Sequence, residues 1–341
     1  MNFEALDWVR LDRLRETFLS ERFDSGAYWQ DEQDLELYDA TFGERIGWKW
    51  DAVLRELAVR GWEPPAGSEL WDWGCGSGVA GRRVLSTWPQ QFTSLRVTDH
   101  SSLAAAFSAR RAVQQIPGLP VSGSPPEWGE GMRPFVLCLS HVWNELTSEV
   151  REHVLDLASA AIAVLWVEPG THTSARALQE VRMRLLARGS HLVAPCAHGA
   201  ACGLLAPGNE RHWCHHFAEP PSGIFADSDW VRFAHRAGLD LRSLPYAFLV
   251  LDRRMPSTAD SNSDSWQRLL GSPRVYKGFA RALFCGVGGV AEWEVPKRSA
   301  PAIHKAWDKG RGGVLYRVEG TAGRVTQIEP WIPPVIQETP R

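Results

Sequence analysis

The sequence predicts an α/β fold in which helices cover both faces of a parallel sheet. Between residues 68 and 190, short apolar runs alternate with segments of helix length. Strands separated by such helices pair in parallel, because each helix carries the chain back across the sheet. A glycine-rich turn follows the first apolar run directly, which is typical of folds that bind a nucleotide at a sheet edge.

The composition is that of a globular protein with a hydrophobic core. Of the 341 residues, 44% are hydrophobic and 23% are charged, and the net charge of -3 excludes a uniformly basic nucleic-acid binder. No apolar run approaches the about 20 residues that span a bilayer, and the N-terminus lacks a signal-peptide core. We therefore expect a cytoplasmic protein without a membrane partner, whose six cysteines are not disulfide-bonded.

Residues 1–67 are expected to form an N-terminal helical segment. Apolar side chains recur at helical spacing over residues 3–22 and again over residues 46–61. The run Pro64-Pro65-Ala66-Gly67 then predicts a linker.

Residues 68–190 are predicted to form a Rossmann-like domain with four strand–helix units. Each strand is an apolar run bounded by turn residues, and each helix shows amphipathic spacing. The strands are expected at 70–73, 95–99, 135–140 and 162–168, and the helices at 79–86, 101–115, 147–160 and 173–189.

The chain changes character after residue 190. Residues 191–290 are expected to hold a metal-binding insertion and the last sheet strands, beginning with an irregular stretch over 191–216. Residues 291–341 are expected to form a basic β-rich extension and a disordered tail. Residues 274–317 contain nine Lys and Arg against three Asp and Glu, which predicts either a surface that faces a polyanion or a solvated surface with chance clustering.

The glycine-rich turn predicts a nucleotide site. The run from Asp72 to Gly78 places an acid two residues before Gly74 and continues with Gly76 and Gly78, which resembles motif I of class I methyltransferases. This resemblance implies a class I methyltransferase-like sheet that binds S-adenosylmethionine. Asp99, at the end of the next strand, is expected to accept both ribose hydroxyls. The alternative is a simple tight turn, with Asp99 capping the following helix.

The third strand ends in a segment with polar side chains. Ser140 is expected to lie in the cofactor pocket, and His141 and Glu145 are candidates for polar pocket groups or for capping and packing roles. The Asn/Asp-Pro-Pro-aromatic tetrapeptide that holds the target amine in amino-methyltransferases is absent from this segment. The sequence therefore identifies no catalytic residue.

Four cysteines are candidates for a metal site. Cys196, Cys202 and Cys214 lie in the irregular stretch, and Cys285 ends a later strand. Four thiolates can hold a structural zinc ion or an iron–sulfur cluster. The competing interpretations are a mixed Cys/His zinc site and a set of buried free cysteines; the histidines concerned are His198, His212, His215 and His216. Cys75 and Cys138 are expected to be free thiols.

Several short motifs in a fixed order resemble one family, the methyltransferase-like protein 17 family of mitoribosomal small-subunit assembly factors, and its bacterial relatives. The resemblance covers about residues 68 to 320. It rests on the runs Val167–Thr171, Val193–His198, Trp213–Phe217 and Pro273–Gly278, together with Cys202 and Cys285. Ala197 and Gly203 stand where the family usually has proline, and His216 interrupts its usual Trp-Cys-His-Phe run.

The resemblance implies a class I methyltransferase fold with an inserted [4Fe–4S] site that associates with the small ribosomal subunit and its rRNA. The cluster ligands it implies are Cys196, Cys202, Cys214 and Cys285. It leaves open whether the protein methylates rRNA or is a non-catalytic assembly factor, and a small-molecule methyltransferase with a structural zinc site is a further alternative. We expect a monomer.

Overall fold

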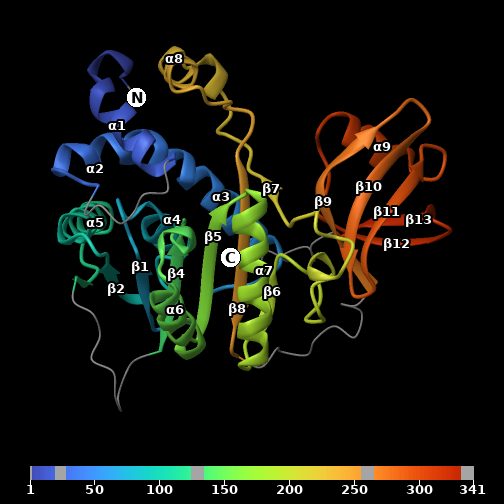
Figure 1. Cartoon of the computed structure of the whole chain (residues 1–341), viewed down its shortest axis with the longest axis horizontal. Coiled ribbons are helices and arrows are strands. Elements are labelled where there is room, and N and C mark those ends of the chain that lie inside the picture. Colours follow the sequence, from blue (N-terminus) through green and yellow to red (C-terminus); the bar gives the residue numbers. More distant parts are fainter. Residues whose placement is uncertain (1, 20–27, 124–133, 255–264, 332–341) are drawn as a thin grey trace, which may run out of the picture.

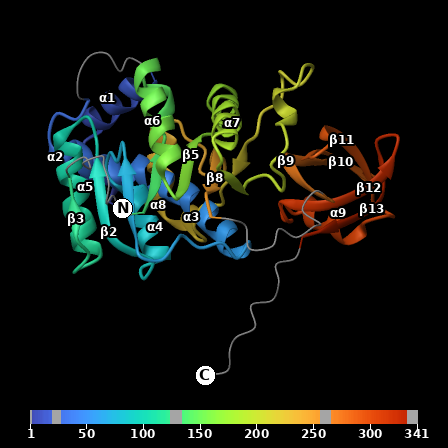
Figure 2. The same cartoon turned by 90° about the horizontal axis from the view of Figure 1, so that it is seen from below.

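The computed structural model of the chain describes residues 2–19, 28–123, 134–254 and 265–331. An eight-stranded sheet with helices on both faces forms the larger part, and a closed β-barrel at the C-terminal end forms the smaller one (Figure 1). Figure 2 shows from a second direction that the barrel lies beside the sheet, on the side of β8. Among the described helices, none is both long and apolar enough to cross a bilayer.

Three helices precede the sheet: α1 (Trp8–Leu19), α2 (Glu32–Tyr38) and α3 (Glu44–Val59), with a π-helical turn at Asp39–Gly43 before α3. The helical spacing in the sequence predicted α1 and α3. It missed α2, whose seven residues EQDLELY carry three acids and no apolar repeat. The Asp31 side chain accepts the backbone N–H of Asp34 and so caps this short helix.

The sheet has five parallel strands: β1 (Ser68–Trp73), β2 (Phe92–Thr98), β3 (Val121–Ser122), β4 (Phe135–Ser140) and β5 (Ala163–Pro169). The strand order is β3-β2-β1-β4-β5-β8-β6. β1 therefore lies between β2 and β4. The chain moves to one side of β1 to form β2 and β3, and then crosses to its other side to form β4 and β5. Such a switch point opens a crevice at the carboxyl ends of the strands.

Three further strands extend the sheet through antiparallel pairs: β6 (His191–Ala194), β7 (His216–Phe217) and β8 (Pro245–Asp252). β8 pairs with β5, and β6 and β7 pair with β8. The expectation of an irregular stretch over residues 191–216 was therefore incomplete. β6 and β7 have four and two residues, which is too short to show the alternation that reveals a strand in a sequence.

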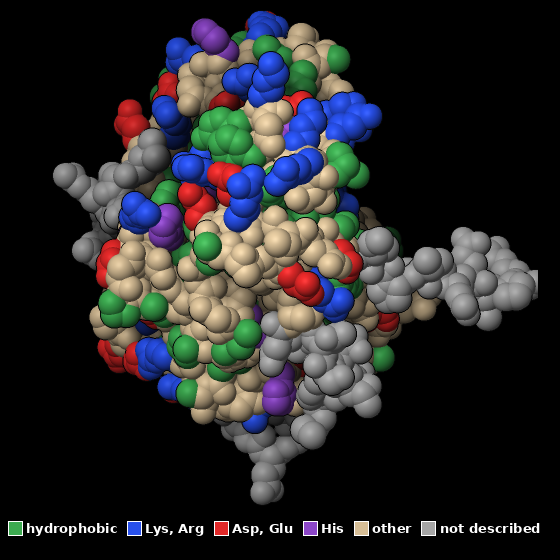
Figure 3. Space-filling view, turned by 90° about the vertical axis from the view of Figure 1, so that its right-hand side faces the viewer, with side chains coloured by type: hydrophobic (Ala, Val, Ile, Leu, Met, Phe, Trp, Pro, Cys, Tyr) green, Lys and Arg blue, Asp and Glu red, His purple; other side chains and the backbone are tan. Residues whose placement is uncertain are grey.

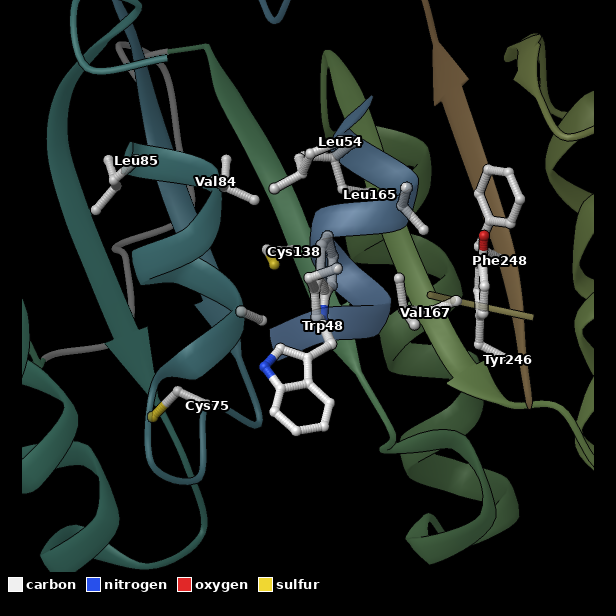
Figure 4. Packing of buried hydrophobic residues seen from close by; sticks show 14 of the residues in the cluster. Trp48, Leu54, Cys75, Val84, Leu85, Cys138, Leu165, Val167, Tyr246 and Phe248 are labelled. Atoms are coloured by element: carbon white, nitrogen blue, oxygen red, sulfur yellow. The ribbon is translucent and has the colours of Figure 1, made fainter. Parts of the chain in front are cut away.

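Helices α4 (Val79–Thr87), α5 (Ser102–Gln115), α6 (Ser148–Ala160), α7 (His172–Ala187) and α8 (Ser228–Ala237) cover the sheet. Side chains of α3, α4, α5 and α8 join one core cluster and those of α6 and α7 another, so the sheet is covered on both faces. Figure 4 shows part of the first cluster, where Trp48 and Leu54 of α3 lie near Leu165 and Val167 of β5.

The C-terminal barrel consists of β9 (Trp266–Val275), β10 (Phe279–Gly286), β11 (Gly289–Pro296), β12 (Leu315–Thr321) and β13 (Arg324–Pro330), with α9 (Pro301–Asp308) between β11 and β12. Its interior holds Phe284, Trp307 and Tyr316 among other apolar side chains. The barrel begins before the boundary expected at residue 290, which falls within β11. The disordered tail was expected from Pro330 to Arg341; Pro330 instead ends β13, and residues 332–341 lie outside the described residues.

A buried group of charges connects α3, the segment after β6 and the barrel. Glu56 of α3 accepts hydrogen bonds from Arg60 at 2.7 Å and from Arg268 of β9 at 3.0 Å. Arg60 also donates to the carbonyls of Val193 and Pro195, at 2.9 and 2.7 Å. The Arg268 side chain is 2% exposed, so this contact is shielded from solvent.

Replacing Glu56 with Gln should destabilise the fold, because two buried guanidinium groups would lose their counter-charge. We expect the free energy of unfolding at pH 7 to fall by about 3–5 kcal/mol, measured by denaturant titration. Asp240→Asn is the control, since its partner Arg242 is exposed and its loss should change little.

The same variant should alter the acid dependence of stability. Burial raises the pKa of Glu56, but the charges and hydrogen bonds of Arg268 and Arg60 outweigh burial and hold that pKa below its ordinary 4.5. The stabilisation is therefore present above pH 4.5 and lost as the pH falls through the folded-state pKa. A Glu56→Gln variant as stable as wild type at pH 7 would contradict this role of the carboxylate.

Candidate functional site

The glycine-rich turn lies between β1 and α4, at the switch point of the sheet. Gly74, Gly76 and Gly78 all have positive φ angles, of 66°, 51° and 78°. A Cβ at Gly74 would meet Val142 at 2.6 Å and one at Gly78 would meet Ser108 at 2.1 Å, whereas a Cβ at Gly76 would meet no atom of the described chain within 4 Å. The turn is thus packed at both ends and open at Gly76, where a ligand can approach the backbone.

Asp99, just after β2, is bonded to this turn. Its Oδ2 accepts the backbone N–H of Gly76 at 2.9 Å, and its Oδ1 accepts that of Ser101 at 2.9 Å. The carboxylate therefore braces the turn and also bonds at the start of α5. Nδ1 of His100 also lies 3.2 Å from Oδ1, so Oδ2 is the oxygen with a second lone pair for the predicted ribose contact, which stays a prediction.

Asp72 is buried at the end of β1. Its Oδ2 accepts the N–H of Gly81 in α4 at 3.0 Å, and its Oδ1 is buried without a hydrogen-bond partner among the described residues. Burial is the main reason that the pKa of this carboxyl rises to about 7. Asp72 therefore anchors α4 to β1 beneath the turn.

Ser140 ends β4 and begins a chain of polar contacts that reaches α3. Its Oγ accepts the indole N–H of Trp50 at 3.0 Å and lies 3.4 Å from Nδ1 of His141. His141, which has a positive φ of 57°, places Nε2 3.3 Å from Nζ of Lys49. Burial lowers the pKa of Lys49 to about 8 and holds the pKa of His141 well below 6.5.

Two carboxyls face the same edge. Burial, followed by the charges of Glu168 and Asp99, raises the pKa of Glu145 to about 8. Burial also raises the pKa of Glu168 to about 7, although its Oε1 accepts hydrogen bonds from the backbone of Val142 and Trp143 at 3.3 and 3.1 Å. Groups that titrate near neutral pH in a buried crevice are typical of functional sites.

The structure therefore brings the residues predicted for a nucleotide site to one edge of the sheet, and it places two further titratable side chains there, Lys49 and Glu168. Lys49 comes from α3, where the helical spacing shows only a polar interruption of an apolar face. Glu168 lies inside the apolar run of β5 and was assigned to a strand. Lys49 carries no local signal, because its place depends on contacts between distant segments. Glu168 lies within the run Val167–Thr171 that supports the family resemblance, and that run could have pointed to it.

The four candidate ligand cysteines gather between the sheet and the barrel. Cys202, Cys214 and Cys285 belong to one buried cluster with Leu204 and Leu270, and the charge of Cys196, after burial, raises the pKa of each of the three thiols. Cys75 and Cys138 lie elsewhere, in the core of the sheet.

This gathering is not a formed ion site. Across the described residues, no group of three or more His, Cys, Asp or Glu side chains is arranged to hold a metal ion. The thiols are nevertheless close enough to influence one another electrostatically. The metal site on these four residues stays a prediction.

Polar side chains surround the thiols. Nε2 of His216 lies 3.6 Å from Sγ of Cys214, and Nη2 of Arg268 lies 3.0 Å from Nδ1 of the same histidine. The charge of Arg268 lowers the pKa of Cys214, and the charge of Arg182 lowers the pKa of Cys285, in both cases against a larger effect of burial. The site therefore contains fixed positive charges that favour thiolates.

The other candidate histidines have different contacts. His215 stacks on Trp213 with ring centroids 4.7 Å apart, and Nε2 of His212 accepts a hydrogen bond from Arg211 at 3.0 Å. His198 is buried. His216, one of the proposed Cys/His zinc ligands, thus contacts a thiol.

The sheet order and the site together define a class of protein. A sheet ordered β3-β2-β1-β4-β5-β8-β6 with an antiparallel β8, and a glycine turn at the switch point, is a class I methyltransferase-like fold. Within that class, the chain belongs to the family described as "Mitochondrial small ribosomal subunit Rsm22", whose model matches residues 51–316. The resemblance found in the sequence is thereby confirmed at the level of this ribosomal family. The assignment to methyltransferase-like protein 17 stays a prediction.

Solved structures overlap with the chain at low similarity. Magnesium protoporphyrin IX methyltransferase from Synechocystis PCC 6803 is 12% identical with a TM-score of 0.39, over 74% of this chain and 97% of that one. A putative RNA methyltransferase from Pyrococcus horikoshii is 11% identical with a TM-score of 0.37, over 62% and 84%. At these scores the fold assignment rests on the sheet order itself. No curated protein gave a significant match.

The pKa of Asp72 predicts a pH-dependent effect on stability. Because the folded-state pKa of about 7 exceeds the ordinary 3.8, the stabilisation is present below pH 3.8 and is lost as the pH rises through 7. Asp72→Asn cannot titrate, so its stability relative to wild type should rise between pH 4 and 8, by up to about 4 kcal/mol. Thermal unfolding across that range measures the difference.

The matched control is Glu152→Gln, which changes an exposed carboxylate on α6. Its stability relative to wild type should show no such rise over the same range. A difference between wild type and Asp72→Asn that stays constant from pH 4 to 8 would show that Asp72 is ionised in the folded protein.

Proposed function

We propose that the protein binds S-adenosylmethionine at the glycine turn, carries a [4Fe–4S] cluster on four cysteines, and acts on or with the rRNA of the small ribosomal subunit. The observation that carries this proposal is the extent of the family match. Residues 51–316 include both the glycine turn and all four thiols, Cys196, Cys202, Cys214 and Cys285. Both proposed sites thus lie within the part of the chain that the family model matches.

The glycine turn fits the cofactor. Gly76 offers open backbone at the switch point, and Asp99 and Ser140 lie at the ends of the two strands that flank β1. Asp99 would hold the ribose and the turn would contact the amino acid part of the cofactor. The cofactor supplies an activated methyl group, and the chain's contribution to a transfer would be orientation of the two reactants.

The preference for an iron–sulfur cluster over a zinc ion at the four cysteines rests on the family resemblance. Thiolates are the usual ligands of both. The buried apolar surroundings and the nearby charges of Arg182 and Arg268 would stabilise an anionic centre.

A non-catalytic assembly factor is the second candidate. It is favoured by the segment after β4, which lacks the amine-binding tetrapeptide and is held by Glu168 through the backbone of Val142 and Trp143. In that case the fold and the cofactor would serve binding to the ribosomal subunit. A small-molecule methyltransferase with a zinc site is supported by the contact between His216 and Cys214.

Anaerobic purification tests the cluster. The wild-type protein should be brown, with about four iron and four inorganic sulfide atoms per chain. Cys285→Ser should lose most of this iron, because one of the four ligands is missing. Cys138→Ala, which removes a buried thiol in β4, should keep it. A colourless wild-type protein with one zinc ion would exclude the cluster and favour the third candidate.

Calorimetric titration with S-adenosylmethionine tests the glycine turn. Gly76→Arg should abolish measurable binding, since its side chain would occupy the open space that the cofactor needs. Gly118→Arg is the control: Gly118 also has positive φ and open space, but lies in the turn between α5 and β3. Equal affinity of the wild type and Gly76→Arg would remove the turn from the cofactor site.

A further inference from the structure

The C-terminal barrel has the strand order of an OB-fold. Counted within the barrel, the order β10-β11-β13-β12-β9 runs second, third, fifth, fourth, first, and α9 joins the third strand to the fourth. OB-folds bind oligonucleotides on the face of their second and third strands and on the loops after the first and fourth. In this chain, that face belongs to β10 and β11, and the loops are residues 276–278 and 322–323.

An aromatic pair lies on this face beside the first loop. Ala280 and Ala282 of β10 are buried in the barrel, so the alternate positions Phe279 and Arg281 are directed outward. The ring of Tyr276 stacks on that of Phe279, with centroids 4.7 Å apart and 23° between the planes. Tyr276 is 45% exposed, so its ring is accessible to a further planar group.

Exposed cations surround the aromatic pair. The backbone N–H of Lys297 donates to the carbonyl of Gly278 at 2.9 Å, which holds Lys297 close to Lys277. The guanidinium of Arg281 lies 5.9 Å from the centre of the Phe279 ring. Figure 3 shows Lys and Arg side chains gathered on the barrel end of the molecule. The cations of this surface are Lys277, Arg281, Lys297 and Arg298, all exposed.

The acidic side chains on the same face are already neutralised. Glu292 pairs with Arg274, and Glu294 lies 3.7 Å from the guanidinium of Arg324. In the part of the chain that the structure describes, the four cations named above form no ion pair with a carboxylate. The charge left available to a ligand is therefore positive.

We propose that Tyr276, Phe279 and these four cations form a surface that binds single-stranded RNA. The proposal rests on the ribosomal role proposed above and identifies the face that meets the RNA. An unpaired base stacks on the Tyr276 ring while neighbouring phosphates contact the cations, which is how sequence-tolerant single-strand binders work. A duplex fits poorly, because its bases are stacked on each other and closed to the ring.

Fluorescence anisotropy with a labelled oligouridine of about 10 nucleotides tests the surface. Tyr276→Ala should weaken binding about tenfold and leave its salt dependence unchanged, because the lost contact carries no charge. Lys277→Ala and Arg281→Ala should each reduce the slope of log affinity against log salt by about 0.7. Tyr276→Phe, which keeps a ring, should bind like the wild type.

Matched controls lie away from this surface. Phe225→Ala removes an aromatic side chain that is 56% exposed on the sheet part of the protein, and Lys309→Ala removes an exposed cation just after α9. Both should bind as the wild type does. Equal losses in controls and surface variants would show diffuse charge attraction and overturn the proposal, as would equal affinity for a duplex of the same length.

The outcomes separate this inference from the ribosomal proposal. If the wild-type protein binds RNA and the three alanine variants on the surface bind equally well, the surface assignment is wrong and the ribosomal role stands. If crosslinking in cells gives no enrichment of small-subunit rRNA, the ribosomal role fails. The surface assignment still holds in that case, provided that oligouridine binding shows the expected variant pattern.

Discussion

The buried contact between Glu56 and two arginines fixes how the parts of this protein meet. Arg60 bonds the backbone of the segment after β6, including the carbonyl of Cys196 at 3.3 Å. Arg268 lies on β9 directly opposite Cys285 of β10. One carboxylate thereby holds two of the four thiols, one from each part of the chain, in a common neighbourhood. Burying a charge is costly, because the charge loses its contacts with water. Here each buried charge has an opposite charge or a hydrogen-bond partner that offsets this cost.

Helix α3 supplies both sites. Near its start, Lys49 and Trp50 contact His141 and Ser140 at the carboxyl edge of the sheet. Two turns later, Glu56 anchors the barrel and the cysteine segment. The same apolar face that packs α3 on the sheet thus sets the geometry of the proposed nucleotide site and of the thiol cluster. A change in how this helix packs on the sheet would therefore alter the geometry of both sites.

Strand β10 joins the second site to the proposed RNA surface. Its outward positions run from Phe279 and Arg281, which are accessible at one end, to Leu283 and Cys285, which face the thiol cluster at the other. Because alternate residues of a strand share a face, the aromatic pair and the cysteine lie on one side of the barrel. The barrel is therefore attached to the sheet by one end of this face and leaves the other end for a ligand.

The sequence alone predicted the strand–helix alternation, the glycine turn, the candidate thiols and the family resemblance. Each of these depends on residues that are close together in the chain. The short strands β6 and β7, the closure of the barrel and the bonds of Asp99 to Gly76 were decided by tertiary structure. So were the positions of Lys49 and Glu168 at the carboxyl edge of the sheet. Hydrogen bonds and burial between segments far apart in the chain create these features, and no periodicity within a segment records them.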